Sequence, residues 1–274
     1  MREFIQVNGV DYFVSVAGEG EPLALLHGFT GSSANWEEVT AVLAPHFRVI
    51  TIDLLGHGRT DSPTNPAHYQ MEKVAADVTA VLQRLISPAS LRFNLLGYSM
   101  GGRLALYIAL HYPHLIQSLI LESASPGLAT DAERTERRRR DEALADKIER
   151  EGIRPFVDFW ENLPLWDSQQ SLSDEVRQIL RQQRLQNNPT GLANSLRGMG
   201  TGAQPSFWAR LDALQMPVLL LAGELDRKFV GIGQQMAAKI PSGQFQIVPG
   251  AGHTVHLEET AVFSKSVLNF LHGI

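Results

Sequence analysis

The sequence has 274 residues, a formal net charge of −5, and 44% hydrophobic against 19% charged residues. These proportions are typical of an ordinary globular protein with enough apolar material for a core, and the acidic balance disfavours nucleic acid as a partner. No apolar stretch approaches the roughly 20 residues needed to span a bilayer, and the N-terminus lacks an apolar signal region. The absence of cysteine excludes disulfides, thiolate metal sites and thiol nucleophiles. We therefore expect a cytoplasmic protein.

In chain order, the first expected element is an antiparallel pair, because two alternating runs flank an Asn8-Gly9 turn. Short apolar runs follow, typical of strands buried on both faces of a parallel sheet. The segments between them have helical spacing, so β and α elements alternate. The expected strands are residues 22–29, 48–56, 93–97 and 116–123, and the expected helices are residues 32–45, 71–85 and 100–112.

The pattern changes after residue 126, where the sequence becomes helical and rich in charge as far as residue 208. Strand-like runs return at 217–225 and 243–253, each followed by a helix. We therefore expect an α/β core of residues 1–126 and 209–274, with a mostly parallel sheet flanked by helices. A helical insertion of residues 127–208, here called the cap, leaves from the carboxyl end of a strand. That is the edge where α/β sheets bind ligands.

The segment Gly97-Tyr98-Ser99-Met100-Gly101 has the pattern G-x-S-x-G between an apolar strand and a helix. This is the nucleophile-elbow pattern, in which the glycines allow a tight turn that lifts the serine hydroxyl above the sheet edge. Alone the pentapeptide is weak evidence, because a serine before a helix is also an ordinary N-cap. The strand before it, the helix after it and the downstream partners favour Ser99 as the reactive hydroxyl.

A reactive serine requires a base, and the base requires an orienting carboxylate, in the chain order Ser, acid, His for this kind of fold. Asp226 follows a strand end, and His253 lies in a glycine-flanked loop after the last strand. Glu224 and His256 are close competitors, and Asp53 is better interpreted as support for the loop after an earlier strand. We expect Asp226 and His253 to complete the set.

Backbone N–H groups are the usual donors to a developing oxyanion. We expect these donors to be Met100, which follows the serine, and Phe29 in the His-Gly loop after the strand at 22–29. His27 in that loop is more simply a brace than a base. No pair of histidines has metal-binding spacing, and no dinucleotide-binding glycine loop follows the first strand of the sheet. We therefore expect no metal and no cofactor.

Arg103 is an unusual residue at its position near the start of the expected helix after Ser99. A cation there opposes the positive N-terminal end of the helix dipole. Ser99 and Arg103 are four residues apart and share a helix face, so the arginine should point toward the catalytic pocket. A desolvated guanidinium requires an anionic partner, which is either a carboxylated substrate or a carboxylate of the protein core.

Several motifs together resemble the α/β-hydrolase superfamily across nearly the whole chain. A narrower resemblance is to the MenH family of 2-succinyl-6-hydroxy-2,4-cyclohexadiene-1-carboxylate synthases of menaquinone biosynthesis. It depends on the arginine of GYSMGGR, on ESASPGL, on the arginine-rich cap helix and on cap segments such as FVDFWENLPLW. The superfamily motifs are LLHGFTGSS, DLLGHGRTD, GYSMGGRLAL, AGELDRKF and GAGH.

This resemblance implies further substrate-binding residues. Arg137, from the four-arginine run Arg137–Arg140, corresponds to a family arginine, with Arg138 as the fallback. At most one or two of the four can face the pocket. Arg184 corresponds to another family arginine, and Trp160 and Tyr98 resemble pocket residues, although Trp160 is equally well explained as packing within the cap.

The resemblance implies a lyase that eliminates pyruvate from a carboxylate-rich cyclohexene precursor, SEPHCHC. In that chemistry the Ser-His-Asp set activates Ser99 to abstract a proton from carbon. Two alternatives remain open: a carboxylesterase or C–C bond hydrolase that uses Ser99 as a covalent nucleophile, and a non-catalytic binding protein of the same fold. The expected partner is a small carboxylated substrate, and the expected assembly is a monomer or weak homo-oligomer.

Overall fold

The computed structural model describes residues 1–86 and 92–274. Its centre is an eight-stranded sheet with the order β1-β2-β4-β3-β5-β6-β7-β8. The β1–β2 and β2–β4 pairs are antiparallel, and all later pairs are parallel, so the predicted mostly parallel sheet is confirmed. The strands are β1 Arg2–Val7, β2 Val10–Ala17, β3 Pro22–Leu26, β4 Arg48–Ile52, β5 Phe93–Tyr98, β6 Ile116–Glu122, β7 Val218–Gly223 and β8 Gly243–Val248.

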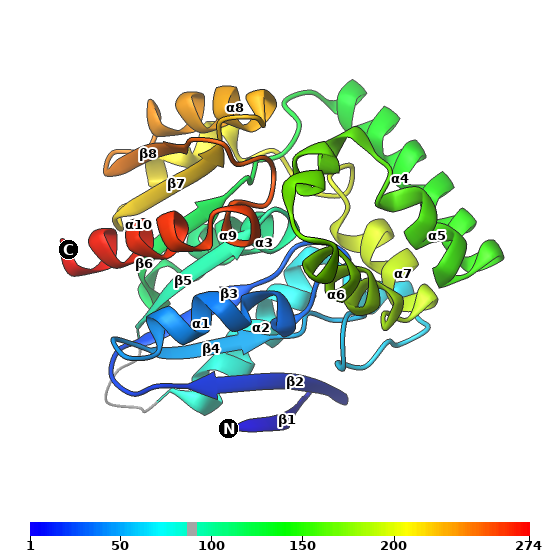
Figure 1. Cartoon of the computed structure of the whole chain (residues 1–274), viewed down its shortest axis with the longest axis horizontal. Helices are drawn as coiled ribbons and strands as arrows, with labels where there is room; N and C mark the ends of the chain where they lie inside the picture. The colour runs from blue at the N-terminus through cyan, green and yellow to red at the C-terminus, as the bar shows by residue number, and fades with distance from the viewer. Residues whose placement is uncertain (87–91) are drawn as a thin grey trace.

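Helices cover both faces of this sheet, because strand side chains alternate between two apolar clusters. In β3, Leu23 and Leu25 face one cluster and Ala24 and Leu26 face the other. The first cluster includes α1, α9 and α10, and the second includes α2, α3 and α8. These helices are α1 Glu37–Leu43, α2 Met71–Leu85, α3 Met100–His111, α8 Arg227–Ala237, α9 Val255–Glu258 and α10 Thr260–His272. Figure 1 shows them around the twisted sheet.

Several boundaries differ from the expected ones, and the strands expected over 48–56 and 243–253 end early, at Ile52 and Val248. The helix expected over 32–45 begins as a 3-10 turn, Ser33–Trp36, in which the Ser32 and Asn35 side chains form a capping box. The strand expected to reach residue 29 ends at Leu26. After it, His27 Nε2 accepts the Leu54 N–H at 2.9 Å. A side chain rather than strand pairing thus links this loop to the segment after β4.

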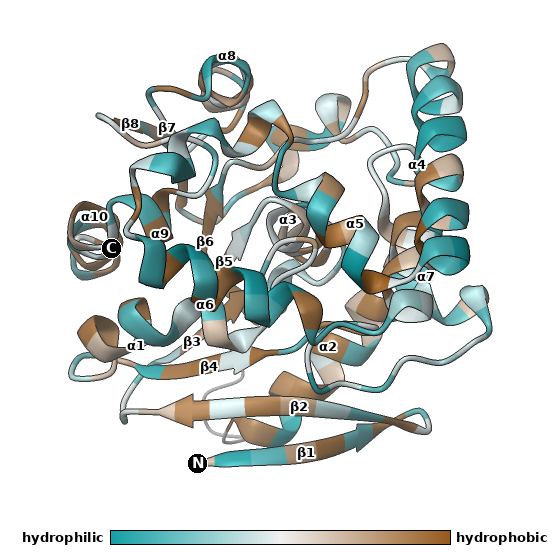
Figure 2. Ribbon diagram, turned by 45° about the vertical axis from the view of Figure 1, so that its right-hand side comes forward, coloured by the Kyte–Doolittle hydropathy of each residue, from teal (hydrophilic) through white to brown (hydrophobic). Residues whose placement is uncertain are grey.

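Only helices and 3-10 segments occupy the described chain between β6 and the 3-10 turn η5 Trp208–Ala213, which precedes β7. They share a separate apolar cluster that includes Ile148, Phe156 and Leu196, and Phe29 of the core packs against it. Figure 2 shows α4 as mainly hydrophilic. No helix in the described ranges is long and apolar enough to cross a membrane. The elements are α4 Asp131–Glu151, α5 Ile153–Trp160, η4 Pro164–Ser171, α6 Asp174–Leu185 and α7 Pro189–Met199.

Candidate active site

Ser99 lies in a sharp turn between β5 and α3. Its backbone has φ 50° and ψ −108°, a conformation that is strained for any residue with a Cβ. The turn requires close backbone approach, because a Cβ on Gly97 would lie 2.4 Å from the Gly101 oxygen, and one on Gly101 would lie 2.3 Å from the Leu26 oxygen. Ser99 occupies the N-cap position of α3, yet its side chain makes no capping hydrogen bond. The hydroxyl is therefore available to another partner.

That partner is His253, whose Nε2 lies 3.1 Å from Ser99 Oγ. The other ring nitrogen, Nδ1, lies 2.6 Å from Asp226 Oδ2. Since an ionised carboxylate can only accept, Nδ1 carries the proton and Nε2 is free to accept from the serine. The His253 and Asp226 side chains are only 3% and 8% exposed. The structure thus brings together the three side chains proposed from the sequence, in the geometry of a serine, base and orienting acid.

The competing residues make other contacts. Glu224 lies just after β7 and accepts the Gly250 N–H at 3.1 Å. His256 forms a buried pair with Glu122, with Nδ1 2.8 Å from Oε2. Asp53 accepts the backbone N–H groups of Ser33 and Arg59, at 2.6 and 2.8 Å, and so supports its own loop.

His27 is completely buried, and this burial lowers its pKa to about 4. Its Nδ1 donates to the Gly28 oxygen at 2.7 Å while Nε2 accepts from Leu54. Both nitrogens are therefore engaged by the loop, and this histidine is a brace.

The two expected backbone donors belong to residues that share a cavity with Ser99. Phe29 and Met100 both line the cavity that contains the serine hydroxyl. Met100 is the first residue of α3, where N–H groups have no partner within the helix and where the dipole is positive. Within the described ranges, neither the Phe29 nor the Met100 N–H donates a hydrogen bond. Both groups are available to an oxygen bound next to Ser99.

The cavity has a volume of about 240 Å³ and lies between the carboxyl edge of the sheet and the cap segment. Its walls contain Ser99 and His253, several apolar side chains and three cationic side chains: Arg103, Arg137 and Lys228. No aspartate or glutamate of the described chain is among the residues that line it. Such a chamber favours an anion over a neutral ligand, because three cations and no carboxylate of the described chain line it, and only Arg137 has a carboxylate partner, Asp141, from outside the wall.

Arg103 is the most deeply buried of these cations, at 9% exposure. Its Nη1 donates to the Met199 carbonyl oxygen at 2.6 Å and to Gln204 Oε1 at 3.2 Å. Both partners are neutral, and within the described residues no carboxylate lies within salt-bridge distance of this guanidinium. Burial above all, and then the charge of Arg137, lower the Arg103 pKa to about 10, although Asp141 partly offsets both effects. The alternative of a salt bridge to a core carboxylate is therefore wrong.

Arg137 is the member of the Arg137–Arg140 run that lines the cavity. Its Nε lies 2.7 Å from Asp141 Oδ1, one helical turn further along α4. Arg138 is exposed and donates to the Gly202 oxygen, while Arg139 and Arg140 both pair with Glu136. The run is mostly a solvated face, as the sequence indicated.

The aromatic candidates also reach the cavity. Tyr98 and Trp160 line it. Burial raises the Tyr98 pKa, and the Tyr98 hydroxyl lies 3.2 Å from Thr254 Oγ1. Trp160 packs edge-on against Phe29, with ring centroids 5.3 Å apart, so it contributes to cap packing as well. Its indole N–H is buried without a hydrogen-bond partner among the described residues.

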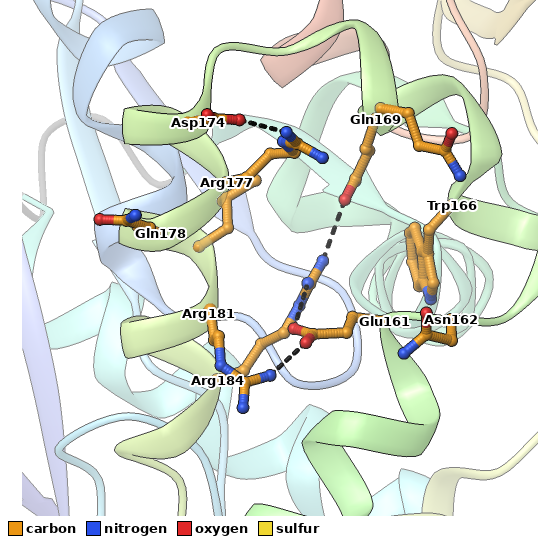
Figure 3. Close-up of a pocket in the computed structure, with 11 residues that line it drawn as sticks. Glu161, Asn162, Trp166, Gln169, Asp174, Arg177, Gln178, Arg181 and Arg184 are labelled. Carbon is orange, nitrogen blue, oxygen red and sulfur yellow. Dashed lines mark hydrogen bonds and ion pairs between the residues drawn. The ribbon is translucent and has the colours of Figure 1, made fainter.

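Arg184 has a different location from the other candidates. It lines a neighbouring pocket under η4 and α6 rather than the walls of the Ser99 cavity. Figure 3 shows its guanidinium between Gln169, at 3.1 Å, and Glu161, at 3.9 Å. Trp166 lines both pockets, and its ring lies 5.5 Å from the Arg184 guanidinium and 5.8 Å from the His253 ring. Trp166 thus stands between Arg184 and His253.

Sequence reasoning missed two kinds of residue in these walls. Trp166 carried no signal, because a tryptophan in a cap helix is usually core packing. Lys228 did carry one: it is a cation in the first turn of a helix, at the positive end of the dipole, as is Arg103.

A mostly parallel sheet with a Ser-His-Asp set at its carboxyl edge defines the class of α/β-hydrolase enzymes. The chain belongs to this α/β-hydrolase fold family, whose model matches residues 21–260. It is a MenH-like enzyme of the superfamily. A Bacillus subtilis (strain 168) protein with the provisional name 2-succinyl-6-hydroxy-2,4-cyclohexadiene-1-carboxylate synthase is 47% identical over 97% of each chain.

Solved structures give the same relationship. MenH from S. aureus superposes with a TM-score of 0.90 at 38% identity and covers 96% of this chain and 98% of its own. A malate-bound thermophilic esterase from Thermogutta terrifontis has a TM-score of 0.85 at 27% identity, covering 100% of this chain and 98% of its own. The fold therefore accommodates more than one chemistry.

Proposed function

We propose that this protein eliminates pyruvate from SEPHCHC, 2-succinyl-5-enolpyruvyl-6-hydroxy-3-cyclohexene-1-carboxylate, as a lyase of the menaquinone pathway. The observation that carries the proposal is the pairing of a Ser-His-Asp set with a cavity that has three cations and no carboxylate. The relatives named as 2-succinyl-6-hydroxy-2,4-cyclohexadiene-1-carboxylate synthases support this substrate, which carries three carboxylates.

In the proposed reaction, His253 takes the proton of Ser99, and the serine oxygen abstracts a proton from the ring carbon next to the succinyl ketone. The electron pair moves onto the ketone oxygen, which the Phe29 and Met100 N–H groups stabilise. When the pair returns, a double bond forms between that carbon and its ring neighbour, the existing ring double bond shifts by one position, and the C–O bond to the enolpyruvyl group breaks. The released enolate takes the proton held by His253 and leaves as pyruvate, while Ser99 keeps the proton taken from the ring carbon. No water, oxidant or metal is consumed in this sequence.

The proposal also assigns parts to the two regions of the chain. Residues 1–126 and 209–274 form the core that supplies Ser99, Asp226 and His253, and residues 127–208 form the cap. The cap supplies Arg137 and Trp160 from α4 and α5, and so contributes to anion recognition. Arg184 belongs to the same set only if Trp166, which separates it from His253, changes position.

A second candidate is a carboxylesterase that uses Ser99 as a covalent nucleophile. The likeness to the Thermogutta esterase favours it, since the same three side chains serve both reactions. The cation set decides between the two, because a neutral ester gains nothing from Arg103 in a desolvated wall.

The test is to supply SEPHCHC and measure pyruvate with lactate dehydrogenase. We expect rapid release by the native protein and a loss of roughly 10³-fold or more in Ser99→Ala, because triad members act as a unit. Ser195→Ala is the matched control, since Ser195 lines the same cavity but donates to Met100 Sδ at 3.5 Å. Brisk hydrolysis of a neutral ester with no pyruvate from SEPHCHC would refute the lyase proposal.

A further inference from the structure

Lys228 is a wall residue of the Ser99 cavity with no structural duty of its own. It is the second residue of α8. The N-cap of this helix is Asp226, whose carboxylate accepts the Phe229 N–H at 3.3 Å. A cation in this first turn is repelled by the helix dipole. The Lys228 side chain takes part in no salt bridge or hydrogen bond with the described residues. Protein stability therefore does not account for the charge.

Phe229 is a common neighbour of the Lys228 ammonium group and the His253 ring. Lys228 Nζ lies 5.5 Å from the centroid of the Phe229 ring, and that ring lies 4.8 Å from the His253 ring. Both Lys228 and Phe229 line the cavity. The lysine is exposed, whereas Arg103 is buried, so the two cations occupy the solvent side and the inner side of the same chamber.

The three cations come from three separate elements. Arg103 belongs to α3 in the core, Arg137 to α4 and Lys228 to α8. In Figure 1, α3 lies near the centre, α4 on the right and α8 at the top, so the three cations belong to helices that lie apart in the fold. A ligand with a single carboxylate could satisfy only one or two of them. A ligand with carboxylates on separate arms could satisfy all three.

We propose that Lys228 binds a third carboxylate of the substrate at the mouth of the Ser99 cavity and so contributes to specificity for a tricarboxylate. This inference rests on the proposed function for the identity of the substrate, although the charge arrangement itself does not. Lys228 is a substrate-binding group rather than a member of the proton-transfer set. Its loss should therefore raise KM and leave kcat nearly unchanged.

The expected magnitude follows from the exposure of the lysine. An exposed ion pair contributes at most about 1 kcal/mol, which corresponds to about a five-fold change in affinity. We expect Lys228→Met to raise the KM for SEPHCHC about five-fold with kcat within two-fold, and Lys228→Arg to restore most of the affinity. The difference should shrink in 0.5 M salt, because an exposed charge is screened.

Arg227 provides the matched control. It is adjacent, exposed and in the same first turn of α8, but it does not line the cavity. Arg227→Met removes the same formal charge from the same helix end and should leave KM within two-fold. Equal KM values for Lys228→Met and Arg227→Met would overturn the proposal. An equal loss of kcat against SEPHCHC and a neutral ester in Lys228→Met would also overturn it, since the lysine would then act on the triad.

A binding experiment separates this inference from the proposed function. Calorimetry would compare propane-1,2,3-tricarboxylate with glutarate, which has the same carbon chain but lacks the central carboxylate. We expect the native protein to bind the tricarboxylate about five-fold more tightly, and Lys228→Met to bind both alike. If the native protein shows this preference but releases no pyruvate from SEPHCHC, the proposed function fails and the Lys228 inference stands. If pyruvate is released and the preference survives in Lys228→Met, only the inference fails.

Discussion

Replacing Arg103 with methionine separates the effect of this buried charge on kcat/KM from its effect on the stability of the fold. The guanidinium is 9% exposed and lines the Ser99 cavity, with only neutral protein partners. Truncating one partner of a buried, hydrogen-bonded charge pair costs about 2–5 kcal/mol. For an anionic substrate we therefore expect kcat/KM to fall by about 30- to 4,000-fold.

The stability of Arg103→Met should change much less. Lowering the Arg103 pKa from its ordinary value to about 10 corresponds to an unfavourable contribution of about 3 kcal/mol. This contribution is fully present below pH 10, where the group is charged in both folded and unfolded states, and is relieved as pH rises from the folded to the unfolded value. The two hydrogen bonds from Arg103 offset it, at roughly 1.5–3 kcal/mol each for a charged donor. We expect Tm to change by less than about 5 °C.

The assay measures pyruvate release from SEPHCHC and hydrolysis of p-nitrophenyl acetate by the same preparations, with Tm from circular dichroism. The anionic substrate should lose activity far more than the neutral ester. Equal losses in the two assays would show that Arg103 supports the triad rather than an anion. A fall in Tm of 10 °C or more would show that the arginine is structural.

Two further predictions concern groups outside the cavity walls. Arg197 forms ion pairs with Glu142, Asp146 and Glu149 on α4, and Glu149 above all raises the Arg197 pKa. Arg197→Met should therefore lower the free energy of unfolding by about 1 kcal/mol and leave kcat/KM unchanged. A loss of activity at unchanged Tm would contradict this. Glu258 accepts the N–H groups on either side of His253, those of Gly252 at 2.6 Å and Thr254 at 3.1 Å, and burial raises its pKa. A raised acid pKa means that protonation favours the folded state and that this contribution is lost as pH rises through the folded pKa. Lowering the pH should therefore reduce kcat before it reduces Tm, because protonation of Glu258 weakens its hold on the two N–H groups beside His253. Glu258→Gln places a donor against one of these N–H groups, so this variant should have a lower kcat at every pH and lack the fall in kcat that protonation of Glu258 causes. An unchanged pH profile in that variant would exclude the role.

The fold was largely predictable because its signals are local and repeated. Short apolar runs such as residues 93–97 are typical of strands buried on both faces, and the glycines around Ser99 favour the turn after them. The meeting of Ser99, Asp226 and His253 was also predictable, since the carboxyl ends of parallel strands share one edge. The catalytic roles of these three residues stay predictions until they are measured.

The cap was harder to predict from the sequence, because its helices carry charge on most faces. In α4, the pattern alone did not show that Arg137 lines the cavity while Arg139 and Arg140 pair with Glu136. In α6, it did not show that Arg184 lies behind Trp166. The rotation of a helix about its own axis depends on tertiary packing when both faces are polar.

The backbone conformation of Ser99 sets the geometry of this turn against the stability of the fold. Backbone strain of this kind costs of order 1–3 kcal/mol, and a domain of this size is stable by only about 5–15 kcal/mol. A notable share of the folding free energy is thus held in one turn, at φ 50° and ψ −108°. A chain in which this turn relaxed would be expected to gain stability and to lose the present geometry between Ser99 and His253. The tightly packed glycines on either side therefore hold a conformation that the folded chain maintains at a cost in stability.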